Sequence, residues 1–543
     1  MKSIKILVLL LSILMAKGLS ASTYYVNPKA GNDKNSGLTK EEPFKSLNKI
    51  NRVNLKPGDS VLLAGGMIHY GSLELVDVYG TLEKPVVISS YLSRESYNNK
   101  ATIDAKDYAN GVLLKNCSNV KVNNLIIEAN GGFGANSKKR TMKCGVFITS
   151  SKPGKFDNIH VSNLLVRDIF QENPGFTRGE KESHTANGTE SYGWGIRVIT
   201  KTKGAIYNNL VIESCTVSNV GHTGIKLTSS KSIRNLKLLN NTVLEAGGPG
   251  LQMSGVVNGL VKGNNVNYSG SKSDSRKWGR GSGLWTWGCS KVLIEHNSFR
   301  NANGPADSAG CHIDFNCDNV IVQYNISENN MGGFCEILGN NYNCAYRYNV
   351  SINDGYRVKQ KGIAFQEGKT FWLSGFNGKD RKRKGPYNSY FYNNTIFVND
   401  AIQAKIAIGN TSEGVLIANN IFYLKGGSIT ARGDQYKPED ATKAVVEDFI
   451  FKNNLFLDGN CWPKDAPIQE ENALYGDVNF KNINGVSTTD FIPQNKELIK
   501  DKGMKIPLIP GDDKGLYIGL NPEYDILGNK IIGLPDVGAI EVN

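Results

Sequence analysis

The sequence lacks the features that would divide it into separate domains or anchor it in a membrane beyond its start. After the first 21 residues, no stretch approaches twenty consecutive apolar residues, which excludes a later spanning helix. Proline is scarce, with 17 residues against 59 glycines, and no Ser/Pro-rich linker or charge block marks a boundary. The nine cysteines form neither a close-spaced disulfide framework nor CxxC pairs, so we expect buried thiols and at most one disulfide.

The beginning of the chain has the pattern of a secretory leader. Lys2 and Lys5 precede an apolar run, and small residues follow as far as Ala21. We therefore predict a signal peptide over residues 1–21 and a secreted or periplasmic protein without a membrane span.

The net charge of the chain indicates which kind of partner it binds. The formal net charge is +13, spread along the chain with one dense run, "KDRKRKG", over residues 379–385. For an exported protein, this favours an acidic polysaccharide or oligosaccharide over nucleic acid. The dense run itself is typical of a solvated loop. We expect a monomer.

A short motif recurs along the chain: an alternating strand, a polar corner with asparagine, and a second short strand. Periods of roughly 24 to 40 residues built in this way are typical of a solenoid. Stacked asparagines can bond one another and the bending backbone at a tight corner. The recurring corner residues are Asn124, Asn163, Asn241, Asn265, Asn297, Asn325, Asn349, Asn394, Asn420 and Asn454.

These repeats predict an all-β fold, a single-stranded right-handed parallel β-helix with an N-terminal capping helix and long loops on one side. The capping helix is expected in the amphipathic segment "PFKSLNKI". Residues 22–100 would form the N-terminal cap and first turns. Residues 101–460 would form the parallel β-helix that carries the active site, and residues 461–543 the C-terminal turns and cap.

A second series of strands begins at glycine, as in "GIKLT" from Gly224 and "GCHIDF" from Gly310. Side chains alternate between the two faces of a strand, so these strands define inward and outward positions. The inward positions are Val146, Ile196, Ile225, Leu251, Leu284, Cys311, Cys335 and Ile363. The positions that we call the outward row are Phe147, Arg197, Lys226, Gln252, Trp285, His312, Glu336 and Ala364. A parallel row two residues further on holds Thr149, Ile199, Thr228, Ser254, Trp287, Asp314, Leu338 and Gln366.

The outward row predicts a functional groove, because clustered aromatics rimmed by polar groups usually mark a binding site. Long inserts precede several of its strands and supply rim candidates, which are His184, Arg276, Lys277, Trp278, Arg280 and Asp307. We predict substrate binding by Arg197, Gln252, Trp285, Trp287 and Arg280. The predicted catalytic residues are Lys226, His312, Asp314, Glu336 and His222. We assign no metal or other cofactor, since no oxygen cage suitable for calcium is evident.

The segments "YYVNPKAGNDKNSGLTKEEPFKSLNKI", "LKPGDSVLLAGG" and "LPDVGAIEVN", together with the asparagine ladder, resemble exported bacterial right-handed β-helix enzymes that act on carbohydrates. The resemblance covers nearly all of the mature chain and is specific for architecture, not for reaction. Members of that group include polysaccharide lyases, glycoside hydrolases and, in ulvan utilisation, an oligosaccharide dehydratase.

One chemistry that fits the predicted residues is β-elimination from a uronate, in which a base removes the proton next to the carboxyl group and an acid assists the leaving C4 oxygen. Arg197 would hold the carboxylate. Lys226 or His312 would be the base, with Asp314 orienting His312. His222 or a tyrosine would be the acid. The basic charge favours this chemistry, so the sequence predicts a carbon–oxygen lyase, as polysaccharide lyase or oligosaccharide dehydratase.

The alternative is a glycosidase that uses Asp314 and Glu336, whose backbones would lie ~8 Å apart on neighbouring turns. With side-chain reach, their carboxyl groups could adopt either the ~5 Å retaining or the ~6.5–9.5 Å inverting separation. A third hypothesis, a non-catalytic glycan-binding solenoid, predicts aromatics without a cluster of titratable groups, which is not what this row shows.

Overall fold

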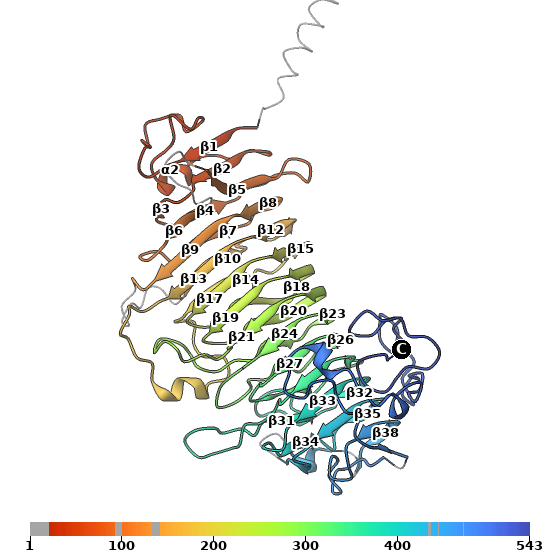
Figure 1. Cartoon of the computed structure of the whole chain (residues 1–543). Coiled ribbons are helices and arrows are strands. Elements are labelled where there is room, and N and C mark those ends of the chain that lie inside the picture. Colours follow the sequence, from red (N-terminus) through yellow and green to blue (C-terminus); the bar gives the residue numbers. More distant parts are fainter. Residues whose placement is uncertain are drawn as a thin grey trace, which may run out of the picture.

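The structure, a computed structural model, describes residues 21–542 except 93–99, 133–141, 433–435, 442, 444 and 471. Apart from Ala21, the predicted signal peptide lies outside these residues. The chain winds into stacked coils that run from the N-terminal to the C-terminal part along one axis (Figure 1). The named strands pair in parallel, and most coils contribute strands to three faces, as a parallel β-helix does.

The site face is the one that carries the predicted outward row. Its strands, in order along the axis, are β4 (Leu73–Val76), β7 (Asn110–Lys115), β10 (Lys143–Thr149), β14 (Gly193–Thr200), the first parts of β18 (Ile225–Leu239) and β20 (Leu251–Lys262), β22 (Leu284–Trp287), β25 (Cys311–Ile313), β28 (Gly333–Ile337), β31 (Lys369–Leu373), β34 (Ala404–Ile408) and β37 (Ser428–Thr430).

The second face follows the site face in each coil, and β18 and β20 bend through the corner without a break. Its strands are β1 (Thr23–Val26), β2 (Ser60–Ala64), β5 (Val86–Tyr91), β8 (Val120–Asn123), β11 (Gly154–Asp157), β12 (Ile159–Ser162), β15 (Ala205–Asn208), β16 (Val211–Glu213), the later parts of β18 and β20, β23 (Ser290–Glu295), β26 (Asp318–Gln323), β29 (Ala345–Arg347), β32 (Tyr387–Tyr392), β35 (Glu413–Ala418) and β38 (Glu447–Lys452).

The third face closes each coil and leads back to the site face. Its strands are β3 (Ile68–Tyr70), β6 (Ala101–Asp104), β9 (Leu125–Asn130), β13 (Leu165–Phe170), β17 (Thr216–Val220), β19 (Thr242–Ala246), β21 (Asn265–Asn267), β24 (Ser298–Arg300), β27 (Ile326–Glu328), β30 (Val350–Ile352), β33 (Thr395–Val398), β36 (Ile421–Leu424), β39 (Leu455–Phe456) and β40 (Leu474–Tyr475).

The helical pieces in the part of the chain that the structure describes are short. They are α2 (Leu47–Ile50) and the 3-10 turns η1 (Glu180–His184), η2 (Pro438–Asp440), η3 (Thr488–Phe491) and η4 (Lys496–Leu498). The predicted N-terminal helix is the single turn α2, capped by the Ser46 hydroxyl, which accepts a hydrogen bond from the Lys49 amide. Leu47 and Ile50 are buried, and the role of this turn as a cap of the solenoid remains a prediction.

The core fills the bore of the solenoid with the predicted inward residues. Seven of them are buried: Val146, Ile196, Ile225, Leu251, Leu284, Cys311 and Cys335. All nine cysteines are buried free thiols, so the prediction of buried thiols is confirmed and none is paired in a disulfide. The inward prediction for Ile363 is wrong, since its side chain is 67% exposed.

A ladder of asparagine side chains runs along the corner between the second and third faces. Asn297 donates through its backbone N–H and its Nδ2 to Oδ1 of Asn325, both at 2.9 Å, which confirms that the two stack on adjacent turns. The prediction of Asn265 in this ladder is wrong, because Asn264 makes the bonds and Asn265 is an exposed residue of β21. The full ladder is Asn241, Asn264, Asn297, Asn325, Asn349, Asn394, Asn420 and Asn454, and it ends on the Glu470 carboxylate.

The first two predicted corner residues, Asn124 and Asn163, lie one position before the ladder position of their coils. Asn124 and Asn163 adopt left-handed backbone conformations, with φ of 55° and 50°, and their side chains bond each other at 3.5 Å. Asparagine tolerates this conformation better than most residues. These two residues therefore make the bend itself and do not belong to the buried ladder.

The C-terminal part both closes the core and returns along the outside of the solenoid. Cys461, Trp462 and Ile468 pack on the end of the main core. Residues from Val478 to Val542 then pack against the outer side of the third face, and those around Ile506 to Leu516 pack against the second face (Figure 1). Neither of these two clusters of described residues includes a strand of the site face.

Candidate functional site

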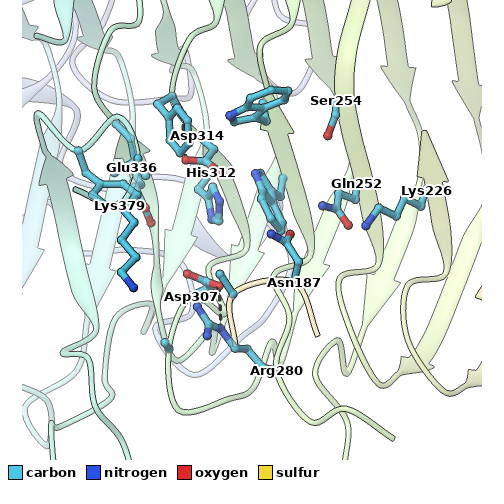
Figure 2. A pocket seen from close by; sticks show the side chains of 18 of the residues that line it. Asn187, Lys226, Gln252, Ser254, Arg280, Asp307, His312, Asp314, Glu336 and Lys379 are labelled. Atoms are coloured by element: carbon cyan, nitrogen blue, oxygen red, sulfur yellow. Dashed lines mark hydrogen bonds and ion pairs between the residues drawn. The ribbon is translucent and has the colours of Figure 1, made fainter. Parts of the chain in front are cut away.

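A pocket of about 890 Å³ lies on the site face, and Figure 2 shows side chains of several strands and loops pointing into it. Four long loops that join the third face to the site face form one wall; they cover residues 171–192, 268–283, 301–310 and 353–368. Residues 374–386, which leave β31 toward the second face, close the other side with Phe376, Lys379 and Arg383. The dense basic run thus contributes to the pocket, although its sequence predicted a solvated loop.

The strand register confirms the outward row up to Glu336. Arg197 pairs with Lys226, Lys226 with Gln252, and so on through Trp285 to His312. The next member is Trp372 on β31, which pairs with Glu336, so the prediction of Ala364 is wrong. The segment "GIAFQ" belongs to the loop 353–368, where a short antiparallel bridge joins Ala364 to Gln360.

The short strand β25 presents two of the predicted catalytic residues. Cys311 and Ile313 point into the core, so His312 faces the pocket. The chain leaves β25 at Asp314, but its N–H still bonds to the Thr286 carbonyl at 3.0 Å, which keeps its side chain on the pocket side. His312 and Asp314 are 4% and 6% exposed, so substrate would reach them only from the pocket.

A third carboxylate comes from the loop before β25. Asp307 has a left-handed backbone, with φ of 47°, and so does Ser308, with φ of 66°. Such conformations persist where surrounding contacts impose them. Here Gln366 accepts from the Asp307 N–H at 2.8 Å, while Arg280 donates from Nε to the Asp307 carboxylate at 2.9 Å. Figure 2 shows Asp307 beside Arg280, facing the His312 side of the pocket.

The three carboxyl groups differ in their protonation. Burial raises the pKa of Asp314 to about 8, and it raises the pKa of Glu336 well above its usual range, with Asp307 and Asp314 adding to the effect. Burial acts in the same direction on Asp307, but Arg280 and His312 overcome it and hold the pKa of Asp307 below its usual value. Of these three groups, Asp307 is therefore the one that favours the ionised form at neutral pH, whereas burial favours the protonated forms of Asp314 and Glu336.

His312 is a neutral imidazole at this pH, because burial lowers its pKa to about 4. Its Nδ1 lies 3.2 Å from the Ser282 hydroxyl, and Asp314 Oδ1 instead accepts from the Phe315 N–H at 2.9 Å. Within the described chain no hydrogen bond joins Asp314 to His312, so the predicted orientation of His312 by Asp314 is wrong.

Of the predicted substrate-binding residues, Trp285, Trp287 and Gln252 line the pocket. Arg197 also lines it, but the Glu190 carboxylate binds the Arg197 guanidinium through both of its oxygens. An arginine neutralised in this way is not the free carboxylate clamp that we predicted. Arg280 positions Asp307, with further bonds to backbone carbonyls of Ser183 and its neighbours.

The prediction of His222 as a catalytic acid is wrong. Its ring is 1% exposed and lies between Trp194 and Trp278, with centroid distances of 4.2 and 4.5 Å. Its two nitrogens contact the Thr223 hydroxyl at 2.9 Å and the Asn187 carbonyl at 3.2 Å. It is not among the residues that line the pocket, and it instead supports the loop that carries Asn187.

Among the other rim candidates, Arg276 and Lys277 are buried beside Asp274 and Glu245 and do not line the pocket. Sequence reasoning assigned no role to Glu190, Phe376 or Lys379, because all three lie in long loops, outside the strand repeat from which the outward row was derived. Asp307 was recognised as a rim residue, but its salt bridge to Arg280 gave no signal in the sequence.

No protein-family model matches the chain. The sequence is 23% identical to the lacto-N-biosidase of Bifidobacterium longum subsp. longum in an alignment of length 630 that covers 96% of this chain and 36% of that protein. The chain thus spans about a third of the length of this curated relative. The solved GH136 lacto-N-biosidase of Eubacterium ramulus superposes with a TM-score of 0.53 and 21% identity, covering 80% of this chain and 68% of that chain. Its selenomethionine derivative gives a TM-score of 0.52 with 19% identity.

The superposition shows that the chain shares its overall fold with the solved lacto-N-biosidase. The comparisons overturn the prediction of a carbon–oxygen lyase, because the matched relatives are lacto-N-biosidases, which are glycosidases. The descriptions of these relatives name neither ulvan nor a uronate. Within the described residues, no helix is long and apolar enough to cross a membrane. The prediction that no metal is required remains a prediction.

Proposed function

We propose that the protein is a glycoside hydrolase that cleaves oligosaccharides bound across the outward row. The observation that carries this proposal is that one pocket brings together Asp307, whose carboxylate the Arg280 guanidinium binds, and Asp314, whose pKa burial raises to about 8. Glycosidases of the common type need one carboxylic acid and one carboxylate on either side of the scissile bond. The sequence comparison with a lacto-N-biosidase supports the same class of reaction.

The roles follow from protonation. Asp314 gives its proton to the glycosidic oxygen as the C1–O bond breaks. Positive charge then develops on the sugar ring, and the Asp307 carboxylate stabilises it. Water supplies the oxygen that replaces the leaving group at C1, and the proton that this water loses restores the proton that Asp314 has given up. Burial raises the pKa of both Asp314 and Glu336, the pair that the sequence predicts, whereas the pKa of Asp307 is lowered, so we assign the role of the carboxylate to Asp307.

The aromatic side chains supply the sugar-binding surface. Trp285 lies beside His312, with ring centroids 5.8 Å apart, and Trp287 meets Phe315 edge-on at 6.0 Å. Trp287 is 37% exposed, so a ring face is available to a pyranose. Arg280 acts through Asp307 and not directly on the sugar.

Product analysis tests the reaction class. The purified protein is incubated with lacto-N-tetraose and with a panel of neutral and acidic oligosaccharides, and the products are analysed by mass spectrometry. We expect the summed product mass to exceed the substrate mass by one water. Products with an unsaturated sugar end, or no cleavage of any panel member, would contradict the proposal.

The pH profile tests the assignment of the acid. Asp314 is competent only while protonated, so we expect kcat/KM to fall as the pH rises through about 8. Because Asp307, Asp314 and Glu336 interact, the measured midpoint belongs to the cluster. The Glu336→Gln variant lacks one of the interacting carboxyl groups. Its kcat/KM should still fall at high pH, but the midpoint of that fall should lie at a different pH. A rate that rises through pH 8 would contradict this assignment.

Three sequence predictions accompany the proposal: right-handed winding of the solenoid, export after removal of residues 1–21, and a monomeric state. Mass spectrometry of the N-terminus of the exported protein and light scattering test the last two. A processed N-terminus near Ser22 and the mass of one chain are the expected results.

A further inference from the structure

One end of the pocket holds a buried lysine that lies over an aromatic ring and has no hydrogen-bonded or salt-bridged partner among the described residues. Lys226 lies on β18 in the outward row, is 8% exposed and lines the pocket (Figure 2). Its Nζ lies 4.8 Å from the centre of the Trp194 ring. In the part of the chain that the structure describes, no hydrogen bond or ion pair engages this ammonium group. A buried charge normally has such a partner, because its desolvation is otherwise uncompensated.

The neighbouring charges do not provide that partner. Arg197, on the adjacent strand, is a second cation, and the nearby Glu190 carboxylate is bound by it. Lys201 adds a third positive charge at the rim. Burial and then Arg197 lower the pKa of Lys226 to about 7, although Glu190 acts in the opposite direction. A negative group from outside the chain would satisfy this end of the pocket.

Further hydrogen-bond donors lie around the lysine, and the described residues leave them without an acceptor. The Thr228 hydroxyl is buried and lacks a hydrogen-bond partner, and it lies two residues along the same strand. Gln252 pairs with Lys226 in the register, and its amide oxygen accepts from Thr223 at 3.5 Å, which leaves the amide nitrogen for the pocket. Positions two residues apart are ~6.7 Å apart and neighbouring strands ~4.8 Å apart, a spacing suited to a group with several oxygens.

This end of the pocket is remote from the carboxyl groups. Lys226 and His312 are separated by Gln252 and Trp285, hence by three strand spacings or ~14 Å. That span exceeds one sugar ring. A group bound at Lys226 therefore belongs to a different sugar from the one at the cleaved bond.

We propose that Lys226, Thr228 and Gln252 form a subsite for an oxyanion, a carboxylate or a sulfate, carried by a sugar remote from the scissile bond. The assignment to a substrate sugar rests on the proposed glycosidase function, whereas the anion site itself does not. The neutral aromatic surface at Trp285 lies between the two ends, as a chain of sugars would require.

A matched set of four tetrasaccharides tests the subsite. Chondroitin sulfate tetrasaccharide carries both groups, its desulfated form only carboxylates, its carboxyl-reduced form only sulfates, and the doubly treated form neither. Calorimetric binding is measured with the wild type, Lys226→Met, Lys226→Arg and Lys237→Gln. Lys237 is an exposed lysine on the same strand but on the second face, so its variant controls for the loss of one charge.

We expect the wild type and Lys237→Gln to bind at least one anionic form ~10-fold or more tightly than the neutral form, as for a charge-assisted hydrogen bond in a buried site. Lys226→Met should lose this preference and Lys226→Arg should keep part of it. The two singly charged forms identify the favoured anion. Equal binding of all four forms by the wild type, or an unchanged preference in Lys226→Met, would overturn the proposal.

Inorganic sulfate provides a probe that does not depend on the sugar backbone. At constant ionic strength, replacing chloride by sulfate should raise the Tm of the wild type more than that of Lys226→Met, with Lys237→Gln matching the wild type. Lys226→Met should itself be at least as stable as the wild type, since it removes an unpaired buried charge. If Lys226→Met were less stable than the wild type and sulfate raised its Tm by as much, Lys226 would serve to pack on Trp194. That result would overturn the proposed subsite. Neither measurement requires turnover, so a failed hydrolysis test leaves this result interpretable.

Discussion

Replacing Asp314 by Asn is expected to lower kcat/KM by ~10²–10⁴-fold, the usual contribution of a positioned acid. Asparagine keeps the size and the hydrogen bond from the Phe315 N–H but has no proton to give to the leaving oxygen. Asp307→Asn should cost a similar factor, because the ionised group opposite the sugar is lost. Initial rates with the oligosaccharide identified by product analysis measure both effects.

Two further variants make this test specific. Glu336→Gln should lose less activity than Asp314→Asn, because a neutral amide resembles a carboxyl group that is already protonated. Asp448→Asn, at an exposed position of β38, should match the wild type. Near wild-type turnover by Asp314→Asn at pH 7, with the fold intact by circular dichroism, would show that another group is the acid.

Replacing Asn325 by Ala is expected to lower the free energy of unfolding by roughly 2 to 5 kcal/mol, since orphaned buried groups and a small cavity are left behind. The Asn325 side chain accepts two bonds from Asn297 and donates to Asn349 and to the backbone carbonyls of Ile294 and Gln323. Each of these bonds lies in the buried corner of the solenoid. Urea unfolding followed by circular dichroism measures the change.

Asn265→Ala is the matched control for the ladder. Asn265 is the exposed neighbour of the ladder residue Asn264, and its backbone pairing does not depend on the side chain. We expect its unfolding midpoint to stay close to that of the wild type. If Asn325→Ala were no less stable than Asn265→Ala, the ladder would not be a source of stability.

Much of the fold could be predicted from the sequence because its information is local and periodic. Alternation along each strand placed Ile196 and Ile225 inside and Arg197 and Lys226 outside, and parallel pairing then aligned them. The prediction failed at Ala364, where a long insertion contains a strand-like pattern that the fold uses in a loop. Periodicity does not reveal which of two similar segments enters the sheet.

The site, like the fold, was predicted where it follows from the repeat and was not predicted where it depends on long-range contacts. The outward residues Trp285, His312 and Glu336 followed from the repeat, and they do line one pocket. The failed expectation for His222 has a different origin. A histidine next to a predicted groove can face the groove or the loop behind it, and the sequence does not show the two tryptophans that enclose it.

By itself, the amino-acid sequence determined the all-β solenoid, the side of each strand that faces the core, and the row of aromatic and titratable residues on one face. The tertiary structure decided which of those groups can do chemistry. Protonation depends on burial and on charges brought from distant loops: Arg280 keeps Asp307 ionised, burial keeps Asp314 protonated, and Glu190 neutralises Arg197. Such contacts join residues of different loops and strands, and their electrostatic effect exists only once the pocket has formed and excluded water.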